Sequence, residues 1–262
     1  MTMMGGVRLR GVTRSARNES LEQQLAGIWG PVFAYGRLGS AMDMAHELAA
    51  EGAPEGSLIF AVRQEQGRGR LGRTWASPEG GAYFALILRP LRSPMDIPQL
   101  SLVAGLAAAE AVNTLTGLYP SIRWPNDLLL DGLKLAGILI ESRSGAVVLG
   151  VGVNVMTKPE DLPAGAASLA GAGKPCEPIA LTAEVCRAMA ARYAAWQGGG
   201  FASLREALRP WIGLFGHPVH VTAGSDYFEG TAQDVDERGR LVVRLDSGLL
   251  RAFEMGEVAL LR

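Results

Sequence analysis

A loop rich in glycine and arginine is the part of this sequence best suited to binding an anion. Residues 67–75 read GRGRLGRTW. Glycines let the main chain fold closely around a ligand, and arginines present planar pairs of N–H donors that match carboxylate and phosphate oxygens. The segment therefore predicts a clamp for anionic groups, with guanidinium groups at Arg68, Arg70 and Arg73. The alternative is a solvated surface loop, which the neighbouring segments make less favourable.

The same loop fits the spacing of a dinucleotide-binding fingerprint, G-x-G-x-x-G, but its surroundings do not. That fingerprint needs a helix that begins at the third glycine and an acidic residue about 20 positions later. Here the third glycine is followed by RTWASPEGGAYF, and the acid nearest the required distance, Asp96, lies in a proline-flanked stretch. The Gly-Lys-Ser/Thr ending of a P-loop is absent as well. The sequence thus disfavours both kinds of nucleotide site.

Polar residues in a second segment, RWPNDLLLDGLKL, could serve the same ligand. Asn126 and Asp127 stand directly before an apolar run, where an amide and a carboxylate could hold a nucleotide, a metal ion or a cationic side chain. Lys134, between two leucines, could direct a positive charge at a carboxylate and a phosphate in a dry pocket. The structural alternatives are an ordinary Asn-Asp turn and a lysine that protects an edge strand.

A third segment, GVGVN, places small residues in a row. On a strand, Gly150 and Gly152 share one face while Val151 and Val153 share the other. A face without side chains permits close approach by a ligand or by packed backbone, and Asn154 then offers a donor and an acceptor. The pattern fits both ligand binding and tight packing.

Apolar runs predict strands around these segments. The arginine-rich loop lies between runs at 58–64 and 82–89, and two more runs flank an Asp131-Gly132 hairpin turn within 122–142. The run at 146–155 adds a further strand. Because three strands follow one another directly, we expect an antiparallel sheet.

Helical patterns occupy much of the remaining chain. Residues 97–116 are rich in alanine and leucine, which predicts a largely buried helix that ends near Gly117. Further helices are predicted at 179–196 and 201–212, and the three glycines at 198–200 are expected to separate them.

The two ends of the chain differ in character from its middle. From Pro218 onward, short alternating runs separated by glycine and aspartate are typical of a small five-stranded barrel, so we place a domain boundary near Gly213. Residues 21–212 then form one domain and residues 213–262 a second. Residues 1–20 are expected to be disordered, with several arginines before the first acid.

Composition excludes several classes of protein. The 262 residues, 48% of them hydrophobic, can bury a sizeable core, and a formal net charge of -1 provides no broad basic field for nucleic acid. Cys176 and Cys186 lack metal-ligand spacing and are expected as reduced thiols, and the three scattered histidines give no support to a nucleophilic hydrolase. A signal peptide and a membrane-spanning run are both absent from the sequence pattern, so we expect a cytoplasmic protein with no membrane partner.

Taken together, these motifs resemble a known family. The ordered set QEQGRGRLGRTW, RWPNDLLLDGLKLAGILIE and GVGVNV, followed by a small barrel, is similar to that of biotin protein ligases over about residues 33–262. The resemblance implies an α+β fold: a mixed, mostly antiparallel sheet flanked by helices, as in class II synthetases, with an SH3-like barrel at the C-terminus. It implies an enzyme that uses ATP and Mg²⁺ to activate biotin as biotinyl-5′-AMP, and that transfers biotin to a lysine of a biotin carboxyl carrier domain of acetyl-CoA carboxylase or a related carboxylase.

The resemblance also implies roles for individual residues. Lys134, Arg68 and Arg70 are the expected catalytic residues, because two anions must meet and charge neutralisation dominates such a reaction. Gln64 is expected at the ureido head of biotin. The arginine-rich loop is expected to be mobile and to close over the ligands. The residues expected at biotin are Ser40, Ala41, Met42, Gln64, Gly67, Arg68, Gly69, Arg70, Lys134, Gly137 and Gly152. Those expected at ATP are Arg70, Arg73, Trp75, Asn126, Asp127 and Asn154, with Asp127 also the candidate ligand for phosphate-bound Mg²⁺.

The chain departs from the family pattern at two places. The usual Ser-Thr pair before the first helix is replaced by Ser40-Ala41-Met42, which removes a hydroxyl contact to the ureido group and bears on biotin affinity. The lysine common before Trp-Pro-Asn-Asp is Arg123, which keeps the charge but changes its shape. Fewer than 40 residues precede Ser40, too few for the winged helix of family members that also act as repressors, so we expect a ligase that does not bind DNA.

Two other functions compete with this interpretation. A lipoate- or octanoate-protein ligase shares the adenylate chemistry, although the arginine-rich loop combined with Trp-Pro-Asn-Asp favours biotin. A non-catalytic regulator could bind biotinyl-adenylate without transferring it, and the expected lack of a DNA-binding domain argues against that function. Family members also form homodimers through sheet edges, an arrangement that this sequence leaves open.

Overall fold

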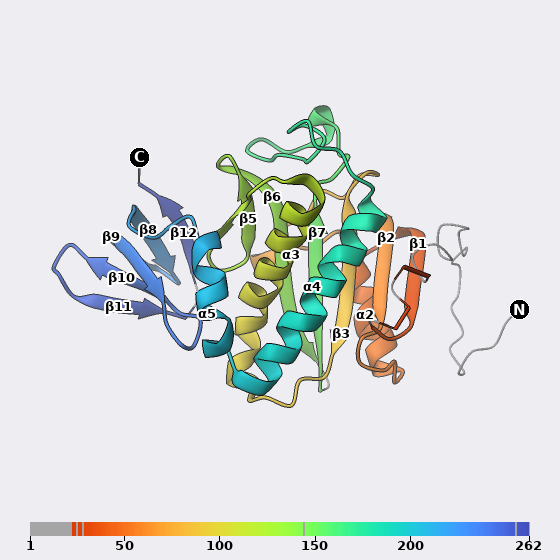
Figure 1. Cartoon of the computed structure of the whole chain (residues 1–262), viewed down its shortest axis with the longest axis horizontal. Helices are drawn as coiled ribbons and strands as arrows, with labels where there is room; N and C mark the ends of the chain where they lie inside the picture. Colours follow the sequence, from red (N-terminus) through yellow and green to blue (C-terminus); the bar gives the residue numbers. More distant parts are fainter. Residues whose placement is uncertain (1–22, 25, 28, 144, 255, 262) are drawn as a thin grey trace, which may run out of the picture.

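The computed structural model describes residues 23–261 apart from positions 25, 28, 144 and 255. The segment 1–20, expected to be disordered, lies outside the described residues. A seven-stranded sheet occupies the centre of the molecule, in the order β1-β2-β3-β7-β6-β5-β4 (Figure 1). Its strands are β1 (Val32–Leu38), β2 (Leu58–Gln64), β3 (Ala82–Leu88), β4 (Ser121–Arg123), β5 (Asp127–Leu130), β6 (Leu133–Arg143) and β7 (Ala146–Val153).

Strand directions follow from how the strands are connected. β1 and β2 are parallel, with a helix between them in the chain, whereas all other neighbours are antiparallel. The predicted hairpin turn between β5 and β6 is confirmed, because Asp131 and Gly132 have φ values of 50° and 80°, as a two-residue turn of this kind requires. The strand β1 was not among the sequence-based predictions.

Helices cover both faces of this sheet, which explains why its central strands are apolar throughout. α2 (Ala41–Ala50) packs on one face, and α3 (Leu100–Thr116) with α4 (Pro178–Gly199) packs on the other (Figure 1). Successive strand residues alternate between the two layers, so Leu58 and Phe60 join the α3 side whereas Ile59 and Ala61 join the α2 side. The sheet is thus the middle layer of three.

The buried helix predicted at 97–116 is confirmed, as α3 preceded by a 3₁₀ turn at Pro94–Gln99. Residues Pro94–Thr116 are apolar and long enough to span a membrane by those criteria alone, but 78% of the most apolar window is buried inside the protein. The segment therefore has the burial of a core helix. Gly117, with φ of 72°, ends it where the sequence predicts.

The predicted break at the three glycines is wrong in position. α4 continues through Gly198 and Gly199, and only Gly200, with φ of 68°, leaves the helical conformation. The fully buried Trp196 holds the last turn in the core, which offsets the cost of about 1 kcal/mol for each glycine in a helix. α5 (Ala202–Leu208) follows directly.

A second, smaller sheet ends the chain. It contains five antiparallel strands in the order β11-β10-β9-β8-β12. They are β8 (Pro218–Ala223), β9 (Asp226–Val235), β10 (Leu241–Leu245), β11 (Leu250–Phe253) and β12 (Glu257–Leu260). A hydrogen bond of 3.0 Å from Trp124 Nε1 to the carbonyl oxygen of Gly239 links the loop between β9 and β10 to the segment between β4 and β5. The predicted α+β class, a mixed and mostly antiparallel sheet flanked by helices, is confirmed. The five strands predicted to form a small C-terminal barrel form an antiparallel sheet, in which the described residues place β11 and β12 at the two ends of the strand order.

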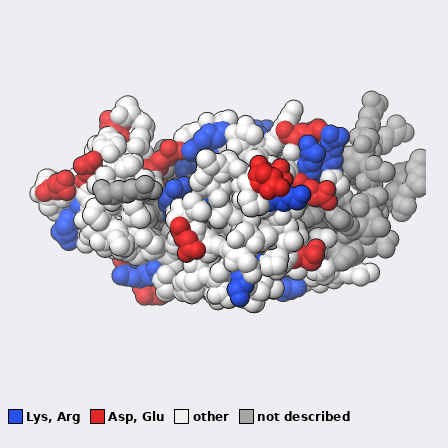
Figure 2. Space-filling model, turned by 90° about the horizontal axis from the view of Figure 1, so that it is seen from above, with Lys and Arg blue, Asp and Glu red and all other residues white. Residues whose placement is uncertain are grey.

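Charge is spread over the surface. On the face of the molecule seen in Figure 2, acidic and basic side chains lie among one another and are separated by uncharged areas. This mixed distribution agrees with the net charge of -1. Among the described residues, this face therefore carries no broad basic patch.

Candidate active site

A cavity of about 490 Å³ lies beneath the arginine-rich loop, between the large sheet and the C-terminal sheet. The three segments selected from the sequence meet here, together with residues of β8 and β12. Of the residues expected at the site, all but Gly67 line the cavity: Ser40, Ala41, Met42, Gln64, Arg68, Gly69, Arg70, Arg73, Trp75, Asn126, Asp127, Lys134, Gly137, Gly152 and Asn154.

The arginine-rich loop is a small hairpin. Its stem is held by hydrogen bonds from Gly69 N–H to the Arg73 carbonyl (2.7 Å) and from Trp75 N–H to the Gly67 carbonyl (2.9 Å). Leu71 at the tip has φ of 56°, which is unusual for a residue with a side chain, and is 77% exposed. At Gly67 an added β-carbon would lie 2.4 Å from the Trp75 carbonyl oxygen, so the base of the loop requires glycine.

The cavity floor is made of glycine backbone. Gly137 on β6 pairs directly with Gly152 on β7, so the two share a face of the sheet. The indole of Trp75 lies on this pair: a β-carbon at Gly152 would stand 2.6 Å from Trp75 Nε1 and one at Gly137 would stand 3.0 Å from Cζ3. Further along β7, Met42 lies against Gly150 in the same way. The glycine row therefore lets Trp75 and Met42 pack closely against the backbone at the floor of the cavity.

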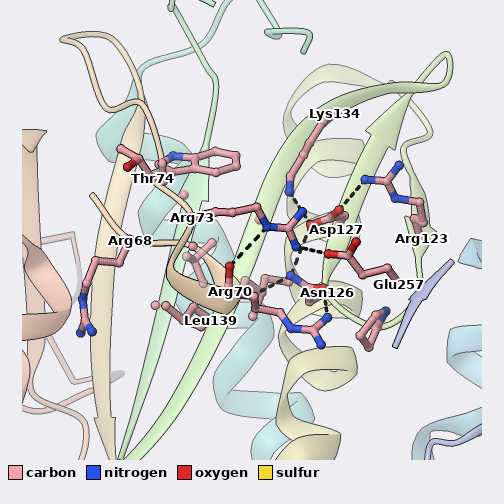
Figure 3. Close-up of a pocket in the computed structure, with 18 of the residues that line it drawn as sticks. Arg68, Arg70, Arg73, Thr74, Arg123, Asn126, Asp127, Lys134, Leu139 and Glu257 are labelled. Atoms are coloured by element: carbon pink, nitrogen blue, oxygen red, sulfur yellow. Dashed lines mark hydrogen bonds and ion pairs between the residues drawn. The ribbon is translucent and has the colours of Figure 1, made fainter. Parts of the chain in front are cut away.

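Asp127 organises the cationic side chains of the cavity. Its carboxylate accepts from Lys134 Nζ at 2.7 Å and from Arg123 Nη2 at 2.6 Å, and its side chain is only 12% exposed (Figure 3). The register of β5 with β6 shifts between Leu128 and Leu129, which gives β6 an extra residue there. Such a bulge redirects the neighbouring side chains, and here Lys134, which precedes the unpaired Leu135, reaches Asp127.

Two of the three loop arginines, Arg70 and Arg73, also turn toward this group. Arg70 donates to Asn126 Oδ1 at 2.8 Å, and Arg73 pairs with Glu257 of the C-terminal sheet (Figure 3). Burial lowers the pKa of Arg70, although the carboxylates of Asp127 and Glu257 oppose that effect. Four cationic groups thus surround two carboxylates, which leaves the cavity electropositive and suited to anions.

The opposite end of the cavity is lined by the apolar side chains of Ala41 and Met42 and by two polar residues, Gln64 and Ser40. Gln64 is committed within the protein, since its Oε1 accepts from Ala41 N–H at 2.8 Å and its Nε2 donates to Ser77 Oγ at 2.9 Å. Ser40 is 4% exposed, and its Oγ has no hydrogen-bond partner within the described part of the chain. A buried hydroxyl of this kind is available to a ligand.

Asn154 has a structural role alongside its place in the cavity wall. Its Nδ2 donates to the Ala167 carbonyl oxygen at 3.0 Å, and its backbone N–H donates to that of Leu135 at 3.0 Å. The residue fastens the segment after β7 to the start of β6, next to Lys134.

Among the described residues, no group of three or more His, Cys, Asp or Glu side chains could hold a metal ion.

Residues from the C-terminal sheet were missed by sequence reasoning. His220, Thr222 and Glu257 line the cavity, and Glu257 pairs with Arg73 across the interface of the two sheets. An acidic residue in the last strand carries no local signal of this kind, because the contact depends on how the second sheet is placed against the first.

Comparisons with known proteins agree with this geometry. Residues 37–157 match the biotin/lipoate A/B protein ligase family, and residues 214–261 match the biotin protein ligase C-terminal domain. The chain is 34% identical over 257 residues to a biotin–[acetyl-CoA-carboxylase] ligase of Mycobacterium tuberculosis, covering 93% of this chain and 95% of that protein. It is 32% identical to the bifunctional ligase/repressor BirA of Bacillus subtilis, over 82% of this chain and 70% of that protein.

A solved structure extends the likeness to three dimensions. The biotin protein ligase of Aquifex aeolicus in complex with biotin and ATP superposes with a TM-score of 0.80 and 27% identity, over 88% of this chain and 99% of that one. The fold and the cavity define a protein ligase of the biotin/lipoate class. Within that class, the chain belongs to the biotin protein ligase family. The resemblance drawn from the motifs is therefore confirmed. The protein is an enzyme of the ligase class.

Proposed function

We propose that the cavity under the arginine-rich loop carries out both half-reactions of a biotin protein ligase. A carboxylate oxygen of biotin bonds to the α-phosphorus of ATP as the bond to the β-phosphate oxygen breaks and pyrophosphate leaves. The amine of a carrier lysine then attacks the acyl carbon of biotinyl-5′-AMP, loses a proton and displaces AMP. The observation that carries this proposal is the convergence of three cationic side chains above the glycine floor: Lys134 and Arg123 on Asp127, and Arg70 on the adjacent Asn126.

The cationic side chains supply the electrostatic part of catalysis. Lys134 contacts Asp127 and Arg70 contacts Asn126, and substrate oxygens would replace these partners. Lys134 would then neutralise the biotin carboxylate and the reacting phosphate, while Arg70 and Arg73 would hold the nucleotide phosphates. Such preplaced charges act strongly in a cavity from which water is excluded. Trp75, Asn126, Asp127 and Asn154 would line the nucleotide side.

The apolar end of the cavity would hold the bicyclic head of biotin. Ser40 Oγ is free to bond the ureido group, whereas Gln64 is engaged with Ala41 N–H and Ser77 and would contact biotin only through its remaining lone pair or N–H. Since Ala41 provides no hydroxyl, recognition of the head would depend on Ser40 and on packing against Met42. The backbone of Gly67 to Arg70 and the Gly137–Gly152 floor would surround the tail.

The residues present fit a Mg²⁺ ion carried by ATP better than one held by protein alone. Both oxygens of Asp127 already accept from Lys134, Arg123 and Asn126, so this carboxylate offers a single ligand at most. Mg²⁺ commonly takes one or two carboxylates and completes its shell with phosphates and water. When bound, the ion would withdraw charge from the phosphates, with Asp127 as its nearest protein ligand.

The proposal extends to the domains and the partner of the protein. Residues 21–212 would form the catalytic domain and residues 213–262 the C-terminal domain, which contributes Glu257 to the cavity. The partner would be the carrier domain of a biotin-dependent carboxylase, met in the cytoplasm. The edge strand β1 offers the surface for a homodimer of the kind that the family resemblance suggests.

Biotin-dependent release of pyrophosphate from ATP tests the activation step. Parallel reactions with biotin, octanoate and lipoate, each with Mg²⁺, would separate a biotin ligase from a lipoate-type ligase. We expect release with biotin alone. Release with octanoate or lipoate but not with biotin would overturn the substrate assignment in favour of the second candidate.

A further inference from the structure

The guanidinium of Arg68 does not join the cationic group around Asp127. Its Nη1 and Nη2 donate to Oε1 and Oε2 of Glu141 at 2.9 and 3.0 Å, and Nη2 also lies 2.9 Å from Asp43 Oδ1. Figure 3 shows this side chain turned away from Arg73, Asp127 and Lys134. Arg68 contributes to the cavity wall, yet its charge is directed at a carboxylate on another strand.

Glu141 is built into a fixed network. It lies on β6, whereas Asp43 and His46 lie on α2, and His46 Nε2 is 2.8 Å from Glu141 Oε2. The side chains of Glu141 and Arg68 are 23% and 29% exposed. Burial acts to raise the pKa of Glu141, but hydrogen bonds from His46 and Arg68 outweigh it and lower that pKa below its usual value. The carboxylate is therefore ionised and holds Arg68 by a two-pronged, charge-assisted contact.

Arg68 stands at the base of the loop. It bridges to Thr74 across the hairpin stem, so a fixed Arg68 also fixes the strand that returns from the tip. Arg70 follows two positions later and Arg73 precedes Thr74. Both arginines project from a stem that Arg68 ties to β6 through Glu141 and to α2 through Asp43.

We propose that Glu141, assisted by Asp43, is a positioning residue that acts through Arg68 to hold the base of the arginine-rich loop, so that Arg70 and Arg73 meet the nucleotide. The inference rests on the proposed function for its catalytic consequence, but the anchoring itself is a property of the free protein. It gives the Arg68 guanidinium a role different from direct contact with biotin or phosphate.

A matched control exists elsewhere in the fold. Glu110 on α3 pairs with both Nε and Nη2 of Arg192 on α4, with exposures of 24% and 31%. This contact is also two-pronged and has nearly the same burial as Glu141–Arg68, but it joins two helices on the opposite face of the sheet from α2. Glu110→Gln therefore reports the general cost of losing such a pair.

The test compares Glu141→Gln with Glu110→Gln in the full chain. We expect Glu141→Gln to raise the KM for ATP and to lower the kcat of biotinyl-AMP formation. Together these changes should lower kcat/KM about tenfold or more, since a small misplacement of reacting groups is costly. Without ligand, trypsin should cleave after Arg70 or Arg73 several times faster than in the parent protein. Glu110→Gln should change neither rate. Equal behaviour of the two variants would overturn the proposal.

A double variant separates positioning from direct catalysis. If Glu141 acts through Arg68, Arg68→Met and Arg68→Met/Glu141→Gln should have the same kinetic constants as each other and resemble Glu141→Gln. Additive losses, or a far larger loss for Arg68→Met than for Glu141→Gln, would contradict it. If the parent protein forms no biotinyl-AMP, the proposed function fails, and the trypsin comparison alone still decides whether Glu141 anchors the loop.

Discussion

Lys134 Nζ lies 2.7 Å from Asp127 Oδ1 and 5.4 Å from the centre of the Trp75 ring. The lysine is thus held by a carboxylate on the neighbouring strand and faces the indole that covers the glycine floor. This arrangement keeps a positive charge in place before any substrate arrives, and it avoids reorganisation during the reaction. Ligand oxygens need only replace one partner of the lysine.

Removal of Lys134 is expected to impair chemistry far more than folding. Lys134→Ala should lower kcat for biotin-dependent pyrophosphate release about a hundredfold or more, because one preorganised charge is lost where the phosphate reacts. Its side chain is 34% exposed, so the thermal unfolding midpoint should move little. The exposed Lys174 provides the control, and Lys174→Ala should behave as the parent protein does. A normal rate of pyrophosphate release in Lys134→Ala would remove this lysine from its proposed role.

The glycine floor predicts a steric effect on biotin binding. Gly152→Ala would place a β-carbon 2.6 Å from Trp75 Nε1, so the indole must move into the cavity. We expect the KM for biotin to rise about tenfold or more, as overpacking displaces the covering ring. Gly36 on β1 has no atom within 4 Å of an added β-carbon. Gly36→Ala is therefore the matched strand control, and similar KM values for the two variants would argue against the floor.

The ion pair between Arg73 and Glu257 joins the loop to the C-terminal sheet. Their side chains are 60% and 49% exposed, and an exposed pair contributes only about 0–1 kcal/mol to stability. Glu257→Gln should therefore leave the unfolding midpoint almost unchanged while making the loop more accessible to trypsin at Arg73. Glu254, directly after β11, is 61% exposed, and Glu254→Gln should leave the cleavage rate as it is. A large fall in stability with unchanged cleavage would show a purely structural contact.

Acid sensitivity should depend on Glu141. The pKa of this carboxyl is lowered in the folded protein by His46 and Arg68 against the effect of burial. The sign follows from linkage: its contribution to stability is present above the unfolded pKa of about 4.3 and is lost as the pH falls through the folded value. Arg143 and Asp43 are the other charged groups of this network, at 3.8 Å from Glu141 and 2.9 Å from Arg68.

Thermal unfolding measured from pH 7 down to about pH 3 tests this dependence. Glu141→Gln should begin with a lower midpoint and lose less of it on acidification than the parent protein does. Glu110→Gln serves again as the control for a half-buried pair. Parallel curves for Glu141→Gln and the parent protein would show that this carboxyl does not contribute to acid sensitivity.

The sequence was most informative where local chemistry determines structure. The Asp131-Gly132 turn, the buried helix that ends at Gly117 and the glycine-arginine loop are each set by a few neighbouring residues, and the structure confirms these elements. The end of α4 was misplaced because packing of Trp196 extends the helix over Gly198 and Gly199. Tertiary contacts of this kind leave no trace in local periodicity.

The sequence predicted which residues line the cavity better than it predicted which partners their side chains contact. The motifs brought Arg68 and Arg70 to one loop, but their guanidinium groups are directed to Glu141 and Asn126 respectively, on different sides of the loop. Which way each turns depends on the position of α2 and on the register of β6, neither of which a loop sequence encodes. The contribution of Glu257 depends likewise on the placement of the second sheet.

Transfer of labelled biotin to a purified biotin carboxyl carrier domain, with ATP and Mg²⁺, tests the central claim most directly. The account predicts label on the carrier that depends on ATP, that is absent when the acceptor lysine of the carrier is changed to arginine, and that falls sharply with Lys134→Ala. Biotinyl-AMP that accumulates without any labelled carrier would contradict the transfer step, and the absence of both products would contradict the account as a whole.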